Sequence, residues 1–158
     1  MRSFLLGLGV ALGVAIVATL GVAYVVTPGG APQYPSHGGW VDQAHTALDS
    51  VASDVATAQL LLRLAEPDRV MGNYQQIVAL NAETEAGKVS DHLAGEQTHP
   101  QDDATYTQVT TVLSDASDLL SSVRVAIVRR DTTQYADLDR ALAKMQTRLS
   151  NAAAKVPS

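Results

Sequence analysis

The chain contains no cysteine. Disulfides, thiolate metal sites, cysteine nucleophiles and a lipid-modified cysteine anchor are therefore all excluded. An absence of cysteine is compatible with an oxidising compartment, although it does not identify one. Whatever fold the chain adopts must be stabilised by the packing of its side chains.

Aromatic residues and positive charge are also scarce. Aromatics make up 4% of the chain, so a core must be built from alanine, valine and leucine. The 16 acidic residues outnumber the 11 basic ones and give a net charge of −5. Nucleic-acid phosphates attract the opposite sign of charge, so we predict no nucleic-acid partner.

The longest apolar run lies near the N-terminus. Residues 4–26 read FLLGLGVALGVAIVATLGVAYVV, and as a helix they would measure about 34 Å, which is enough to cross a bilayer. A cleaved signal peptide is the alternative, because Arg2 precedes the run and Gly21 and Ala23 are small enough for a cleavage site. The run continues through Val26 and exceeds a signal-peptide core, so we predict a retained transmembrane helix.

Basic residues predict the orientation of this helix. Arg2 precedes it, and the next basic residue is Arg63. Positive charge favours the cytoplasmic side, so residues 1–3 are predicted to be a cytoplasmic N-terminus. The protein is then a single-pass protein of the cell membrane whose C-terminal domain is extracytoplasmic, on the periplasmic side.

Small residues recur along residues 4–26 at helical spacing. Gly9 and Gly13 form a GxxxG pair, and a second stripe consists of Ala11, Ala15, Thr19 and Ala23. Small side chains let a second helix approach closely where lipid removes the hydrophobic driving force. We therefore predict that Gly9, Gly13, Ala11 and Ala15 contact a helix of a partner within the lipid bilayer. The alternative is that glycine and alanine are simply common in such segments.

Residues 27–39 are predicted to be a linker rich in proline and glycine. Prolines at 28, 32 and 35 favour extended backbone, and glycine pairs at 29–30 and 38–39 add flexibility. Tyr24, Tyr34 and Trp40 carry amphipathic rings suited to a membrane–water boundary. We predict partner contacts for Tyr24 and Trp40 there. A cleavable or disordered linker is the alternative interpretation.

Beyond residue 39 the apolar residues recur in alternating steps of three and four, the spacing of one face of an α-helix. Four such seams follow one another, at residues 41–65, 71–93, 106–127 and 135–156. Amphipathic helices with short connections pack most simply as an antiparallel up-down-up-down four-helix bundle. The predicted fold class is therefore all-α, with the bundle formed by residues 40–158. Asp102 or Asp103 is the predicted N-cap of the third helix, and Asp131 or Thr132 that of the fourth.

One end of the predicted bundle has more apolar residues than a seam needs. Leucines at 60, 61, 62 and 64 lie opposite Val123, Val125, Ile127 and Val128. Two interpretations are open: burial at the end of the bundle, which we favour, and a protein-binding patch.

The histidines are the strongest candidates for metal ligands. His45 and Asp49 have the i,i+4 spacing that can hold a divalent ion, as do His92 and Glu96. A di-metal bundle site needs Glu-x-x-His on two facing helices, and that spacing occurs once, at Glu96. We therefore predict no metal site and no cofactor, and interpret the histidines as solvated.

No motif predicts catalysis. The serines occur in no GxSxG turn, and Asp102 and Asp103 are adjacent in sequence, which fits a helix start better than an acid–base pair. We predict a protein that is not an enzyme and has no evident small-molecule substrate. A sensor of this layout would return to the cytoplasm through a second membrane helix, and no second apolar run precedes Ser158. Any signal would therefore need a partner.

In layout, the apolar segment, the proline–glycine linker and the helical outer domain resemble the single-pass accessory subunits of actinobacterial respiratory supercomplexes of the cytochrome bcc–aa3 type. The resemblance covers the whole chain as architecture and carries over no residue. It implies a place on the outer face of an electron-transport complex.

Together these features predict a non-catalytic accessory, assembly or stabilising subunit of an integral-membrane complex. The alternative is a membrane-anchored extracytoplasmic module that binds a metal ion, a small ligand or an envelope component.

Overall fold

The computed structural model describes residues 37–64, 72–95, 98 and 100–157, all of which belong to one compact unit, Tyr34–Ser158. These residues form four long helices, α1 (His37–Leu64), α2 (Gly72–Ala94), α3 (Asp103–Arg129) and α4 (Tyr135–Ala153), with short 3-10 turns η1 (Pro100–Asp102) and η2 (Thr132–Gln134). The described residues contain no strand, so the predicted all-α class is confirmed.

The predicted transmembrane helix, residues 4–26, lies outside the described residues, as do Gly9, Ala11, Gly13, Ala15 and Tyr24. None of the helices that the structure describes is sufficiently long and apolar to cross a membrane. Residues 27–36 of the predicted linker are also outside the description.

The first helix begins earlier than predicted. Gly38 and Gly39 were assigned to the linker, but α1 starts at His37 and includes both. A glycine in a helix costs about 1 kcal/mol relative to alanine. The next turn buries Trp40 and Val41, and this burial offsets the cost.

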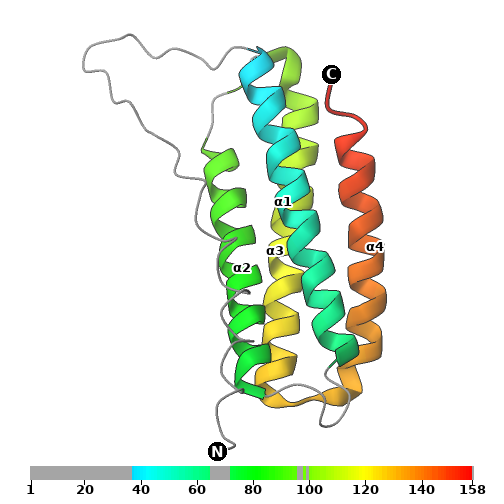
Figure 1. Cartoon of the computed structure of the whole chain (residues 1–158). Coiled ribbons are helices and arrows are strands. Elements are labelled where there is room, and N and C mark those ends of the chain that lie inside the picture. Colours follow the sequence, from blue (N-terminus) through cyan, green and yellow to red (C-terminus); the bar gives the residue numbers. More distant parts are fainter. Residues whose placement is uncertain (1–36, 65–71, 96–97, 99, 158) are drawn as a thin grey trace, which may run out of the picture. The chain divides into compact units, whose positions relative to one another are not determined.

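Successive helices run antiparallel and lie side by side (Figure 1). α1 packs against α2 and α4, and α3 packs against the same two helices. α1 and α3 also contact each other across the bundle, whereas the described residues of α2 and α4 do not. We call the end where α1 and α3 begin the proximal end, and the end where α2 and α4 begin the distal end.

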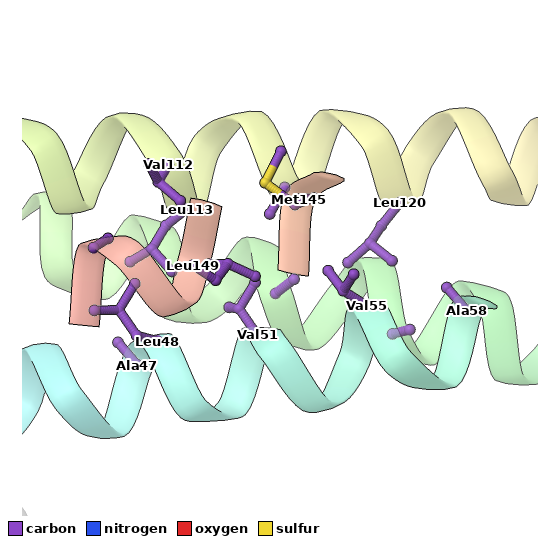
Figure 2. Close-up of a cluster of buried hydrophobic side chains, with 14 of the residues drawn as sticks. Ala47, Leu48, Val51, Val55, Ala58, Val112, Leu113, Leu120, Met145 and Leu149 are labelled. Atoms are coloured by element: carbon purple, nitrogen blue, oxygen red, sulfur yellow. The ribbon is translucent and has the colours of Figure 1, made fainter. Parts of the chain in front are cut away.

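The core is aliphatic and fills the space between the helices. Figure 2 shows Leu48, Val51 and Val55 of α1 facing residues of α3 and α4 such as Leu113 and Leu149. Buried alanines lie between them, where they let the helices approach: Ala44, Ala58, Ala82, Ala86, Ala116 and Ala152. The seams predicted for α1, α3 and α4 are buried or partly buried at every described position.

The seam predicted for α2 is partly wrong. Tyr74 is 60% exposed, while Ala79, outside that seam, is buried. The predicted seam takes two successive four-residue steps from Ala82 to Tyr74, and eight residues turn a helix about 80° past two full turns. The observed stripe instead runs from Ala82 to Ala79, which keeps it facing α1 and α3.

The N-cap position predicted for α3 is confirmed, whereas the one predicted for α4 is wrong. Asp102 occupies the N-cap position of α3, but its side chain is 5% exposed and makes no capping bond. Asp131 precedes η2 rather than α4, and its carboxylate accepts hydrogen bonds from Thr133 Oγ1 and Gln134 Nε2, each at 2.5 Å. The 3-10 turn moves the start of α4 to Tyr135, so neither Asp131 nor Thr132 caps that helix.

Because the core depends on aliphatic contacts, Leu113→Ala should lower the free energy of unfolding by about 2–5 kcal/mol. Leu113 is fully buried, whereas Leu60 is 56% exposed. The matched control Leu60→Ala should therefore change the free energy by less than about 1 kcal/mol. Urea denaturation followed by circular dichroism measures both. Equal losses for the two variants would contradict the core as described.

Candidate functional site

Trp40 belongs to the core rather than to a membrane boundary. Its side chain is 1% exposed, and its ring centroid lies 6.3 Å from that of Tyr106. The predicted partner contact is therefore wrong for Trp40. In a chain with one tryptophan, burial of the largest ring stabilises the proximal end more than exposure would. Tyr106 donates a hydrogen bond to the carbonyl of Ala94 at 2.8 Å and thus joins α2 to α3 there.

The predicted metal-ligand pairs are not assembled into a site by the described residues. His45 Nε2 lies 3.4 Å from the carbonyl oxygen of Pro157. His92 is exposed in the last turn of α2, and Glu96 and His99 lie outside the description. In the part of the chain that the structure describes, no group of three or more His, Cys, Asp or Glu residues could hold a metal ion.

A half-buried carboxylate, that of Asp54, lies on the side of α1 that faces α2, and no sequence motif predicted it. Asp54 Oδ2 is inaccessible to solvent and has no hydrogen-bond partner among the described residues. Burial, and to a lesser extent the negative charge of Glu85, raises the pKa of Asp54 to about 6. Glu85 in turn binds Lys88 Nζ at 2.8 Å. The interaction of Asp54 with Glu85 could not be predicted from the sequence, because it depends on which side of α1 faces α2.

The exposed large hydrophobic residues gather at the distal end. We call them the α2 strip: Leu60 and Leu64 of α1, Tyr74, Ile77 and Leu80 of α2, and Val128 of α3. Tyr74, Ile77 and Leu80 are each at least half exposed. Ile77, Leu80 and Val128 line a groove of about 410 Å³ between α2 and α3. Exposed apolar clusters of this kind are more often found at interaction sites than elsewhere on a protein surface.

The apolar residues predicted at the distal end are buried only in part. Leu61, Leu62, Val123 and Ile127 are buried, whereas Leu60, Leu64 and Val128 are exposed. The residues of one helix turn point in all directions, so only some of four neighbouring leucines can face the core. Burial, which we favoured, therefore accounts for part of this end only.

Positive charge lies beside the α2 strip. Arg124 pairs with Glu83, and Arg63 Nε lies 3.0 Å from Asp139 Oδ1. Arg129 and Arg130 follow at the end of α3. A Cβ atom at Gly72 would lie 3.8 Å from Arg130 Nη2, so this guanidinium lies beside the first residue of α2.

A second groove, of about 500 Å³, lies between α3 and α4 at the proximal end. Its lining is mixed, with Ala104 and Val112 beside polar residues that include Thr107, Thr111, Arg148 and Lys155. Arg148 already pairs with Asp115 at 2.5 Å. The groove offers hydroxyl and cationic groups but no buried charge.

No protein-family model, curated protein or solved structure matches this chain. The candidate functional surfaces therefore rest on the geometry of this chain alone.

The raised pKa of Asp54 predicts that the stability of the fold depends on pH. Its pKa rises from an ordinary 3.8 to about 6 in the fold, so the folded chain holds this proton more tightly than the unfolded chain does. Its contribution is therefore most favourable below about pH 4 and is lost as the pH rises through about 6. Asp54→Asn removes the buried charge. At about pH 7.5 it should raise the free energy of unfolding by about 1 kcal/mol, a value reduced for solvent screening.

Chemical denaturation of both proteins at about pH 4 and about pH 7.5 measures this difference. Near pH 4, Asp54 is protonated in the fold and only about half ionised in the unfolded chain, so the variant should gain little. Asp118→Asn, which changes an exposed carboxylate of α3, is the matched control. A gain of equal size at both pH values would contradict a buried charge at Asp54.

Proposed function

We propose that the chain is a non-catalytic accessory or stabilising subunit of an integral-membrane protein complex. It docks through a predicted transmembrane helix, residues 4–26, and through its extracytoplasmic four-helix bundle. The resemblance in layout to accessory subunits of respiratory supercomplexes suggests an electron-transport complex as the partner. In this proposal the N-terminus is cytoplasmic and the bundle lies on the periplasmic side of the membrane.

The observation that supports a docking role best is the α2 strip. Six large hydrophobic side chains are exposed at the distal end of the bundle. The other large hydrophobic side chains among the described residues are buried or partly buried. Such a surface is typical of a protein that works by contact with other polypeptides. An absence of metal clusters among the described residues is compatible with the proposal but carries no weight for it.

The second candidate function is a membrane-anchored binding module. The groove between α3 and α4 favours it, because Arg148, Lys155 and two threonines would suit a small anionic or polar ligand. Extraction in a mild detergent followed by mass spectrometry separates the two functions. Recovery together with integral-membrane subunits supports the first, and recovery alone with a bound small ligand supports the second.

The predicted small-residue stripe gives a test of docking. Gly13→Leu should reduce recovery of the full-length chain with its membrane partners, because a larger side chain separates the two helices. Val14→Leu, at the next position of the same segment, is the matched control and should leave recovery unchanged. Immunoblotting of the membrane fraction checks that both variants insert. Unchanged co-purification of inserted Gly13→Leu would count against the stripe as an interface.

A further inference from the structure

Side-chain bonds join most neighbouring helices of the bundle. They connect α1 with α4, α2 with α3 and α3 with α4 through the pairs Ala52–Gln146, Glu83–Arg124 and Asp115–Arg148. α1 packs against α2 as well. With Gly39 and His92 at the proximal end set aside, no hydrogen bond or ion pair between α1 and α2 occurs among the described residues. Apolar packing therefore holds this contact closed along most of its length.

The contact between α1 and α2 also includes a carboxyl oxygen without a partner. Asp54 Oδ2 is inaccessible to solvent and accepts no hydrogen bond from a described residue. Glu85 of α2 adds a second carboxylate, which is 58% exposed and pairs with Lys88. An ionised Asp54 therefore meets both burial and a like charge, of which burial is the larger obstacle. A protonated Asp54 avoids both.

No described cation offsets the charge of Asp54. The lysine and arginine side chains of α1 and α2, and the arginine within α3 that faces α2, each pair with another carboxylate: Arg63, Lys88 and Arg124. The other lysines and arginines on or beside α3 and α4 are exposed: Arg129, Arg130, Arg140, Lys144, Arg148 and Lys155. Asp49, the preceding carboxylate of α1, is exposed too. The charge that acts on Asp54 is that of Glu85.

α2 has less buried area to lose than α3 or α4. Its buried residues are three alanines and Leu93, whereas α3 and α4 each bury two leucines and other large side chains. Apolar burial stabilises in proportion to area, so moving α2 costs less than moving either of them. The Glu83–Arg124 ion pair and the hydrogen bond from Tyr106 to the carbonyl of Ala94 hold α2 on α3. Movement of α2 is therefore easier away from α1 than away from α3.

We propose that the contact between α1 and α2 is controlled by a proton: it is closed while Asp54 is protonated and opens as Asp54 ionises, with α2 remaining on α3. Opening would uncover Ala58 and Leu61, which are buried on the same side of α1 as Asp54. This conformational change goes beyond the proposed membrane role and does not depend on it.

The direction of the pH dependence follows from the two states of the contact. In the closed contact, mainly burial raises the pKa of Asp54 from 3.8 to about 6. An open contact returns the carboxyl to water and its pKa to the ordinary value. The closed contact is therefore favoured most below about pH 4, and this preference is lost as the pH rises through about 6.

Distances between spin labels measure the opening directly, because the chain has no cysteine of its own. In the full-length protein in detergent, labels on Ala56→Cys of α1 and Thr84→Cys of α2, both exposed positions, should report a second, longer distance as the pH rises. Between about pH 5 and about pH 7.5 the ratio of open to closed molecules should increase about three- to tenfold, a range reduced for solvent screening. Pulsed electron paramagnetic resonance measures both populations.

A second label pair tests whether α2 stays on α3. Ser114 is exposed on α3, so labels on Thr84→Cys and Ser114→Cys report the distance between these two helices. This distance should be the same at both pH values, because the links between α2 and α3 do not involve Asp54.

Two variants test the carboxylates in the background of the Ala56→Cys and Thr84→Cys labels. Asp54→Asn cannot ionise, and Glu85→Lys places a cation near Asp54, so either variant should keep the closed distance at both pH values. Asp91→Lys makes the same change of charge at another exposed position of α2 and is the matched control. It should retain the pH-dependent opening.

Three results would overturn the proposal. An unchanged distance between the labels at 56 and 84 at both pH values means that the contact does not open. Opening that persists in both Asp54→Asn and Glu85→Lys assigns the pH dependence to another group. A change in the distance between the labels at 84 and 114 means that α2 leaves the bundle altogether. Circular dichroism checks that each variant is folded, and no membrane partner is needed, so this proposal and the docking role can fail separately.

Discussion

The close contact of α1 with α3 determines the rest of the bundle. These two helices contact each other across the centre, and the core contains buried alanines such as Ala44, Ala58 and Ala116, whose methyl side chains allow closer approach than leucine would. α2 and α4 are then held at opposite corners, where each packs against two helices only. α2 buries a narrow stripe of mainly alanine and leaves Tyr74, Ile77 and Leu80 outside. The exposed strip is therefore a consequence of how the core is packed.

The same packing explains the distribution of charge on α2. Its uncharged first half carries the strip, and its acidic second half lies between α1 and α3, where Glu83 pairs with Arg124 and Glu85 with Lys88. Asp54 of α1 lies near this acidic half. Burial, and to a lesser extent the charge of Glu85, raises its pKa to about 6. A half-buried carboxylate with an inaccessible, unpartnered oxygen costs stability when it is ionised. That cost is limited because the group takes up a proton within a moderately acidic range.

The fold could be predicted from the sequence because three of the four seams repeat without interruption. A strict repeat states which side of a helix is buried, and the seams of α1, α3 and α4 coincide with the core. The sequence could not predict which side of α2 faces out, since its weak repeat fits two stripes that differ at Tyr74 and Ala79. Trp40 was misassigned because an amphipathic ring next to glycines fits a membrane boundary as well as a core. No sequence pattern predicted the raised pKa of Asp54, because one of its causes, Glu85, lies on the neighbouring helix α2.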